Sequence, residues 1–136
     1  TSLPNLNEVE EKVLEFTNNG DDVIIITISS GISGTYNAMN LLFQDKKVRV
    51  IDSKTAVGGI KILVNEINKY KNESIDFIEE KVISLRSRIK VMAIPETLTY
   101  LFRGGRLSKT EWLVGSALHI NPIITFKEGK VKRYEN

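Results

Sequence analysis

The sequence predicts an α/β fold built from parallel-sheet crossover units, followed by the start of a second α/β domain after about residue 95. An almost continuous apolar, β-branched run at 23–28 is typical of a strand covered on both faces. A helical pattern and a second apolar strand follow within about thirty residues, the length of one strand–helix–strand crossover. From Pro95 onward, short helical pieces separated by glycine replace this pattern. We therefore assign residues 1–95 to part of an N-terminal domain, and residues 96–136 to a hinge and the beginning of a C-terminal domain.

The first elements follow from hydrophobic spacing and capping residues. Asn5 and Glu8 resemble a capping box at the start of a helix that ends near residues 18–20. After the first strand we expect a helix over about 33–43 and a second strand over 47–52. A polar turn follows each strand, at 29–35 and at 52–55. Because ligands collect at the carboxyl ends of strands in open α/β sheets, we expect both turns to line one crevice.

Later elements are marked by the same signals. We expect a helix over about 56–71, a helix capped by Ser74, a third strand over 90–94 and a short helix over 97–102. Ser108 and Glu111 form a second capping-box pattern, and Glu128-Gly129 separates two strands of a hairpin, 121–126 and 130–134. Since an isolated hairpin is only marginally stable, we expect strands from outside this chain to complete its sheet.

Composition excludes several classes of protein. The chain has 136 residues, of which 41% are hydrophobic and 26% charged, and no apolar run approaches the ~20 residues that span a bilayer. Stable membrane insertion is therefore not expected. The absence of cysteine excludes disulfides and thiolate metal sites, and agrees with the cytoplasmic location that we expect. The net charge of +2 is too small to predict a nucleic-acid partner.

The charge is unevenly distributed, because residues 103–136 carry 7 Lys and Arg against 3 Asp and Glu, a net charge of +4. A solvated surface explains this basic tail. A structural or interaction domain that binds an acidic protein is the alternative, and it predicts binding that weakens with salt.

The turn after the first strand is the leading candidate site. Ser29, Ser30, Ser33 and Thr35 offer hydroxyl groups there, and the helix that follows begins with unpaired N–H groups that favour an anion. Ser33 is also explained as a helix N-cap that binds no ligand, because serine is favoured at that position whether or not a ligand exists. Both roles stay open from the residues alone.

Hydrolytic and metal-dependent chemistry are disfavoured. A serine nucleophile needs a base, and the single histidine, His119, lies in an apolar stretch. The Gly-x-Ser-x-Gly spacing of a nucleophile elbow is also absent. One histidine and no cysteine leave only carboxylates such as Asp21 and Asp22, which lie in a turn, so we assign no metal and no cofactor.

Phosphate binding is a rival hypothesis. Residues 103–106, Arg-Gly-Gly-Arg, combine a flexible pair of glycines with two guanidinium groups that can each donate two hydrogen bonds to a phosphate. They lack the spacing of a P-loop. A helix C-cap at Gly104-Gly105 is an equal explanation. The alternative function is therefore binding or turnover of a phosphorylated small molecule at the serine-rich turn and Arg106.

Five motifs, in this order and spacing, resemble the DegV family of bacterial lipid-binding proteins. They are Thr1-Ser2-x-Pro4, Ser29 to Tyr36, Val50-Ile51-Asp52-Ser53, Gly104 to Ser108, and Asn121-Pro122-Ile123. The resemblance implies that the chain is a fragment, roughly the middle half, of a two-domain DegV-type fold. It also implies a non-catalytic protein that binds a long-chain fatty acid and presents the carboxylate to the catalytic subunit of a fatty acid kinase, which performs the phosphorylation.

The resemblance also implies which residues hold the fatty acid carboxylate. They are Thr1, Ser33 and Arg106, and we add Ser30, Gly34 and Thr35 as secondary candidates. The family also uses a histidine near its C-terminus and an Asp-Ser segment near its N-terminus. Neither has a counterpart here, and His119 does not occupy the position of that histidine.

Overall fold

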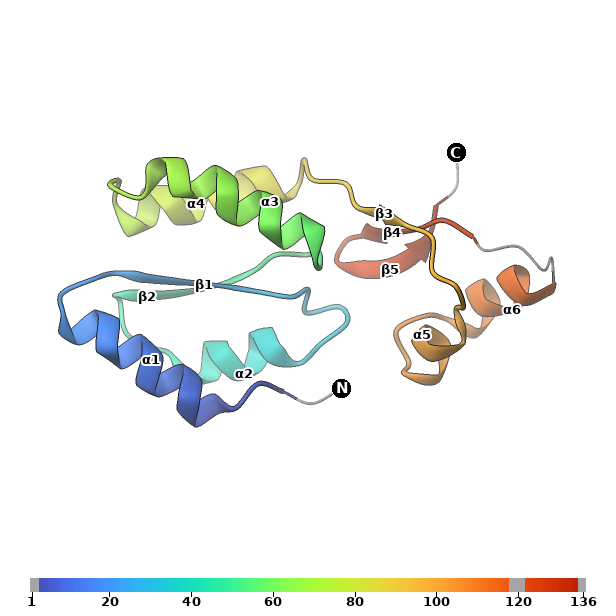
Figure 1. The fold of residues 1–136 in the computed structure, drawn as a ribbon, viewed down its shortest axis with the longest axis horizontal. Coiled ribbons are helices and arrows are strands. Elements are labelled where there is room, and N and C mark those ends of the chain that lie inside the picture. The colour runs from blue at the N-terminus through green and yellow to red at the C-terminus, as the bar shows by residue number, and fades with distance from the viewer. Residues whose placement is uncertain (1–2, 118–121, 135–136) are drawn as a thin grey trace.

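The computed structural model describes residues 3–117 and 122–134, and it has the expected α/β fold (Figure 1). In chain order the elements are α1 (Leu6–Asn18), β1 (Val23–Thr27), α2 (Thr35–Leu42), β2 (Val48–Asp52), α3 (Gly58–Ile67), the short 3-10 helix η1 (Asn68–Tyr70), α4 (Ile75–Arg86), β3 (Met92–Ala93), α5 (Thr99–Arg103), α6 (Lys109–Ala117), β4 (Ile124–Lys127) and β5 (Lys130–Arg133). In the described part of the chain no helix is long and apolar enough to cross a membrane.

Strands β1 and β2 form a parallel pair, which confirms the predicted crossover. Their register runs from Val23 opposite Val48 to Thr27 opposite Asp52. Figure 1 shows α3 and α4 over one face of this pair and α1 and α2 over the other. The main core cluster lies on the α3–α4 side, where Leu63 and Val82 are fully buried beside Ile51. Most of β1 is only half-buried, because a two-stranded sheet leaves each strand with an open edge.

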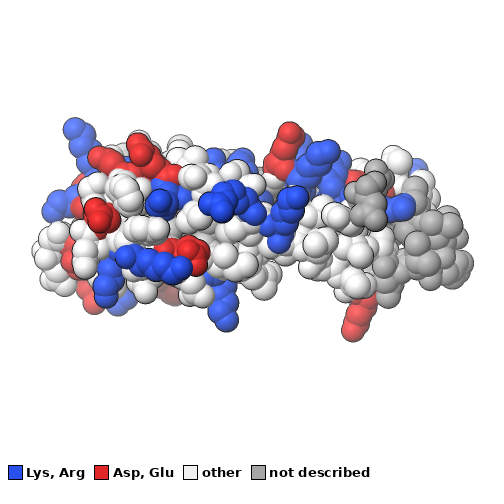
Figure 2. All heavy atoms as spheres, turned by 90° about the horizontal axis from the view of Figure 1, so that it is seen from above, with Lys and Arg blue, Asp and Glu red and all other residues white. Residues whose placement is uncertain are grey.

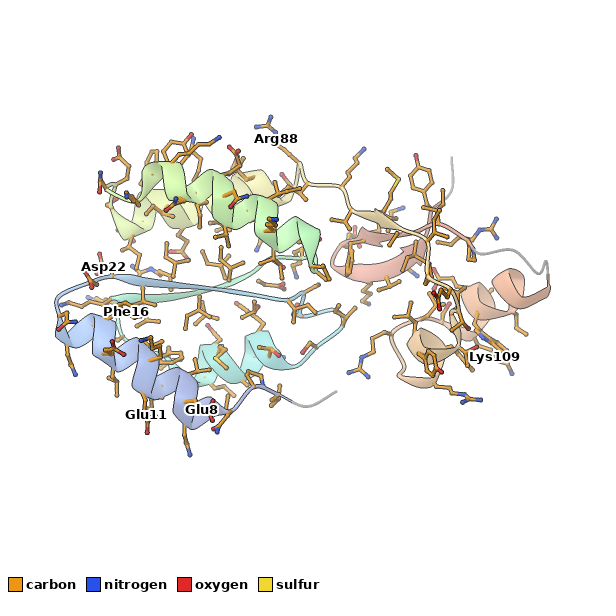
Figure 3. All side chains as sticks on the ribbon, viewed as in Figure 1. Glu8, Glu11, Phe16, Asp22, Arg88 and Lys109 are labelled. Atoms are coloured by element: carbon orange, nitrogen blue, oxygen red, sulfur yellow. The ribbon has the colours of Figure 1, made fainter. Side chains whose placement is uncertain are left out.

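Helix α1 begins as the sequence predicts. The side chain of Asn5 accepts a hydrogen bond from the amide of Asn7 at 3.2 Å and donates one to Glu8 at 2.7 Å. Figure 3 shows Glu8 and Glu11 on the side of α1 that faces away from the sheet. The polar face of α1 is therefore in solvent, and its buried residue, Val13, faces inward.

The starts of α4 and α2 test two further predictions of N-cap residues. Ser74 caps α4 as predicted, because its hydroxyl accepts a hydrogen bond from the amide of Phe77 at 3.2 Å. The N-cap role of Ser33 is wrong: α2 begins at Thr35, and Gly34, which has no side chain to form a cap bond, is the N-cap residue. The backbone of Gly34 is already near helical angles, so the hydroxyl of Ser33 bonds locally to Thr35 instead.

A second sheet has the antiparallel order β3-β4-β5. The predicted hairpin is confirmed as β4 and β5, and Glu128 and Gly129 at its turn have φ angles of 53° and 79°. The expected third strand is reduced to β3, and it pairs with β4 rather than extending the parallel pair. At least one strand that completes the hairpin's sheet therefore comes from this chain, contrary to our expectation. The boundary near residue 95 stays a prediction.

The second sheet has its own core. Leu98, Leu107 and Val131 are buried together, and the ring of Trp112 stacks on that of Phe102 with their centroids 4.7 Å apart. The second sheet and helices α5 and α6 therefore enclose an apolar cluster separate from the one beneath α3 and α4.

Candidate functional site

The polar turns that follow β1 and β2 lie against each other, as their positions at one sheet edge predict. The amide of Ser29 donates to the carbonyl of Thr55 at 2.8 Å, and the amide of Ser53 donates to the carbonyl of Thr27 at 3.2 Å. Ser29 and Ser53 are fully buried. The two turns are thus joined through their main chains before any side chain contributes.

The carboxylate of Asp52 joins the two turns further. It accepts hydrogen bonds from the amide and hydroxyl of Ser30 and from the amide of Lys54, and it pairs with the Lys54 ammonium at 2.9 Å. Burial raises the pKa of Asp52, but the hydrogen bonds from Ser30 and Lys54 outweigh this, so its pKa lies below the ordinary value of 3.8. Sequence reasoning placed Asp52 in the polar turn at 52–55 and in one family motif, but not among the candidate site residues. The detectable signal was an Asp directly after a buried strand, which commonly bonds the backbone two residues later.

The hydroxyls of Ser33 and Thr35 lie next to each other where α2 begins. Their oxygens are 2.9 Å apart, and the hydroxyl of Ser33 also accepts from the amide of Thr35 at 3.2 Å. Both residues are half-buried. The side chain of Leu3 lies 3.8 Å from where a Cβ on Gly34 would stand, so the N-terminal segment passes this turn. Thr1 lies outside the described residues.

Arg106 reaches the same turn from 74 positions away in the sequence. Its Nε donates to the carbonyl of Ile32 at 2.9 Å, and its guanidinium also donates to the carbonyl of Gly104. Gly104 is the C-cap of α5, and Gly105 has a φ of 74°, as the C-cap explanation predicts. The loop between α5 and α6 is therefore shaped to bring a guanidinium beside the residue that precedes Ser33.

The turn of the β4–β5 hairpin packs directly on the serine-rich turn. The buried hydroxyl of Ser29 donates to the carbonyl of Gly129 at 2.5 Å. A Cβ on Gly31 would overlap that carbonyl, and a Cβ on Gly129 would lie 2.6 Å from the Ser29 hydroxyl. Glycine is therefore required at Gly31 by the close approach of the Gly129 main chain, and at Gly129 by the Ser29 side chain and a φ of 79°.

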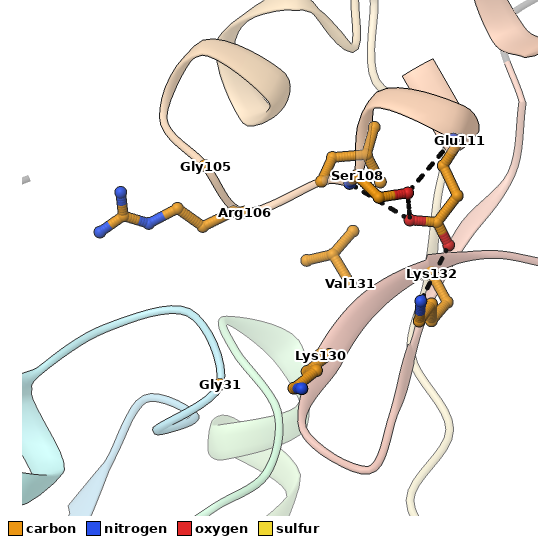
Figure 4. A pocket seen from close by; sticks show the side chains of 9 residues that line it. Gly31, Gly105, Arg106, Ser108, Glu111, Lys130, Val131 and Lys132 are labelled. Atoms are coloured by element: carbon orange, nitrogen blue, oxygen red, sulfur yellow. Dashed lines mark hydrogen bonds and ion pairs between the residues drawn. The ribbon is translucent and has the colours of Figure 1, made fainter. Parts of the chain in front are cut away.

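A cavity of about 340 Å³ opens between these segments (Figure 4). It is lined by Gly31, Gly105, Arg106, Leu107, Ser108, Glu111, Lys130, Val131 and Lys132. Figure 4 shows Arg106 pointing toward the loop that contains Gly31. Three cations and two apolar side chains line this space, a combination that suits a ligand with an anionic group and an apolar part.

Glu111 is the one carboxylate among the residues that line this cavity, and it is engaged. It accepts from the hydroxyl of Ser108 at 2.8 Å in the predicted capping box, and it pairs with Lys132 at 3.4 Å. Burial raises its pKa, yet the bonds from Ser108 and the charge of Lys132 prevail, so the pKa lies below 4.5. The negative charge of Glu111 is thus partly neutralised on the cavity wall.

The other sequence candidates lie elsewhere. Asp21 and Asp22 line a separate cavity of about 380 Å³ at the opposite end of β1. Within residues 3–117 and 122–134, no group of three or more His, Asp or Glu side chains could hold a metal ion. His119 lies outside the described residues. Figure 2 shows Lys and Arg side chains scattered over one face with acidic residues among them, rather than gathered in one broad basic patch.

Comparison with known proteins gives consistent matches over the whole chain. A family model described as "Uncharacterised protein, DegV family" matches residues 1–136. A DegV domain-containing protein of Clostridium acetobutylicum is 36% identical over 134 residues, which cover 94% of this chain and 48% of that protein. The chain therefore spans about half the length of the curated relatives it matches.

Solved structures show the same fold. A DegV family protein from Thermus thermophilus, described for its fatty acid binding, superposes with a TM-score of 0.84 at 26% identity, over 98% of this chain and 49% of that one. A DegV family protein from Eubacterium eligens, loaded with heptadecanoic acid, superposes with a TM-score of 0.73 at 26% identity, over 89% of this chain and 48% of that one. About half of a two-domain fold is thus represented here.

Proposed function

Because the chain belongs to the DegV family, we propose that it binds a long-chain fatty acid and holds its carboxylate at the Ser29–Thr35 turn, beside Arg106. The observation that carries this proposal is the meeting of Arg106 with the residue before Ser33, at the edge of a cavity lined by cations and apolar side chains. The two solved relatives described with fatty acids support the ligand class.

The chemistry of the turn suits a carboxylate. Taking a carboxylate out of water is costly unless several donors meet it. The hydroxyls of Ser33 and Thr35, the first N–H groups of α2 and the guanidinium of Arg106 are such donors, and Ser30 and Gly34 lie in the same turn. We therefore keep Ser33 and Arg106 as the head-group residues, and Ser30, Gly34 and Thr35 as secondary ones.

Thr1 is the third proposed head-group residue. The contact of Leu3 beside Gly34 supports this, because two residues of extended chain span at most about 7 Å. This length of chain is the basis on which we propose a head-group role for Thr1.

The acyl chain would supply most of the affinity. Each buried methylene contributes about 0.8 kcal/mol. Leu107 and Val131 give this cavity its apolar wall, and both belong to the second core. We propose that this half of the fold holds the head-group end, and that the rest of a DegV-type fold encloses the remaining tail.

We further propose that the bound carboxylate is presented to the catalytic subunit of a fatty acid kinase, in the cytoplasm, where ATP is available. The protein would then be a carrier without a catalytic residue or cofactor of its own. Incubation of the intact protein with a fatty acid, ATP and the kinase subunit should yield an acyl phosphate, trapped as a hydroxamate by hydroxylamine. Hydroxamate formation that is the same with and without this protein would contradict the carrier role.

Native mass spectrometry of the purified intact protein tests ligand binding directly. We expect a mass increase equal to one fatty acid, released as free fatty acid on organic extraction. A ligand-free protein that also fails to take up added heptadecanoic acid would disprove the proposal.

A phosphorylated small molecule remains the second candidate, because Arg106, Lys130 and Lys132 all line the cavity. Competition separates the two ligands. If the fatty acid hypothesis is correct, long-chain fatty acids displace a bound fluorescent fatty acid, whereas short phosphate esters do not. Displacement by phosphate esters at lower concentration than by fatty acids would favour the second candidate.

A further inference from the structure

We propose that Asp52 is a positioning residue that holds the carboxylate-binding turn in place without touching the ligand, an inference that rests on the proposed function. Asp52 ends β2, and the turn it holds follows β1. The contact between the end of β2 and this turn is made by Asp52 and Ser30, which are 22 positions apart in the sequence.

The contacts of Asp52 use both carboxylate oxygens. Oδ1 accepts from the amide of Ser30 at 3.1 Å and from the amide of Lys54 at 2.9 Å. Oδ2 accepts from the hydroxyl of Ser30 and pairs with the Lys54 ammonium at 2.9 Å. The main-chain carbonyl of Asp52 accepts from Arg86 at 2.7 Å, which ties the end of β2 to α4. The side chain is only 6% exposed.

All four partners of the carboxylate are donors, so an ionised acid is the group that suits this position. A carboxylate accepts about four hydrogen bonds, and these four are occupied by the protein. The side-chain amide of an asparagine at this position would direct its own N–H group toward at least one of these donors. Since Lys54 also offsets the negative charge, Asp52 can lie beneath an anion site with little repulsion of the bound carboxylate.

Hydrogen bonds within the turn link the position of Ser30 to that of the head-group residue Ser33. The carbonyl of Ser29 accepts from the amides of Ile32 and Ser33 at 3.1 and 3.2 Å. Fixing Ser30 through Asp52 therefore fixes the adjacent Ser29 carbonyl, and with it the backbone of Ser33. Donors arranged around a ligand lose much of their effect when they shift by about 1 Å.

The test compares Asp52→Asn with the matched control Asp45→Asn in the intact protein. Asp45 also accepts a backbone amide two residues on, that of Lys47 at 2.8 Å, but it is exposed and precedes β2. We expect Asp52→Asn to weaken heptadecanoic acid binding roughly tenfold, equal to about one charge-assisted hydrogen bond. Binding of heptadecanol, which lacks the carboxylate, should change far less, and Asp45→Asn should change neither.

A second measurement does not depend on a ligand. Hydrogen exchange of peptides that contain residues 29–35 should accelerate in ligand-free Asp52→Asn, while peptides from α4 keep their protection. Unchanged exchange in the turn would overturn the positioning role even if fatty acid binding is confirmed. If the wild-type protein binds no fatty acid, the proposed function fails, and exchange still tests the role of Asp52 in the turn.

Ser30→Ala covers the case in which Asp52→Asn does not fold, and because Ser30 is itself a secondary head-group residue, its hydrogen exchange without ligand is the measure of positioning. It removes the hydroxyl bond to Asp52, so its turn should also exchange faster and its preference for acid over alcohol should fall. Because both variants break the hydrogen bond between Ser30 and Asp52, hydrogen exchange of the turn in the ligand-free double variant should be no faster than in Asp52→Asn. Fully additive increases in exchange, or equal losses of acid and alcohol binding in Asp52→Asn, would contradict the inference.

Discussion

Ser33 illustrates how a single hydroxyl can be misassigned from sequence. The residue type suits a helix N-cap, yet its hydroxyl contacts Thr35, and Gly34 is the N-cap. The hydroxyl therefore accepts one amide at the start of α2 but is not its cap residue. Its removal should affect a ligand more than it affects the fold.

The Ser33→Ala variant tests this expectation. We expect fatty acid binding to weaken roughly ten- to hundredfold, the loss of a hydrogen bond to a charged group, with little change in the free energy of unfolding. Adding Thr1→Ala should weaken retention further. The measurements are fluorescent fatty acid titration and urea unfolding, with Ser87→Ala at the end of α4 as the control. Unchanged affinity in the double variant would refute the assigned head-group residues.

Gly31 is the residue at which steric fit is most demanding. A Cβ there would overlap the Gly129 carbonyl, so Gly31→Ala should force the two turns apart and destabilise the protein by about 1–3 kcal/mol. Gly58→Ala is the matched control, because a Cβ on Gly58 meets no atom within 4 Å and the residue lies in α3. It should be neutral or stabilise by up to about 1 kcal/mol. Equal urea midpoints for the two variants would show that the contact between the turns is loose.

The first turn of helix α6 forms part of the cavity wall. Ser108 and Glu111 bond reciprocally across its first turn, and Glu111 continues to Lys132 on β5. This helix start therefore joins the α5–α6 pair to the second sheet through one carboxylate.

The lowered pKa of Glu111 predicts how the contact between the start of α6 and β5 responds to acid. The folded state favours the ionised form, so its stabilisation is complete above the ordinary pKa of 4.5 and is lost as pH falls through the lower, folded pKa. Asp52 contributes with the same sign below 3.8. Unfolding free energies measured from pH 6 down to pH 2.5 should fall, and less steeply in Glu111→Gln. Identical slopes in both proteins would mean that Glu111 is not coupled to folding.

The molecule as a whole has two apolar clusters, and both polar and apolar contacts join the parts that contain them. One contains Leu63 and Val82, the other Leu107 and Val131. The serine-rich turn contacts the second part through hydrogen bonds, from Arg106 to Ile32 and from Ser29 to Gly129, and through the side chain of Ile32, which packs against the second cluster. Ligand binding at the candidate site would tie the two parts together.

We propose that the division near residue 95 separates two units of stability. Leu63→Ala should cost about 2–5 kcal/mol and accelerate hydrogen exchange mainly in β1, β2, α3 and α4. Leu107→Ala should accelerate exchange mainly in α5, α6, β4 and β5. If either variant accelerates exchange equally throughout, the chain is one cooperative unit and the division is wrong.

Local sequence patterns predicted much of the fold but few of the contacts that form the candidate site. Capping at Asn5, Ser74 and Ser108, the parallel crossover and the hairpin turn were all predicted, because each depends on residues within a few positions or on buried periodicity. The strand over 90–94 was assigned no partner, because pairing is a property of the sheet. Asp52 was not singled out as a site residue, because its importance comes from donors on another turn.

Residue chemistry alone predicted the α/β class and the ends of most helices, because propensity and capping depend on short stretches of sequence, and the ordered motifs gave the resemblance to the family. It did not reveal that Arg106 would meet Ile32 across 74 positions, or that Ser29 would meet Gly129 across 100. These two contacts depend on how the second sheet packs against the ends of β1 and β2. Packing is a many-body property of both cores, so no short stretch of sequence encodes it.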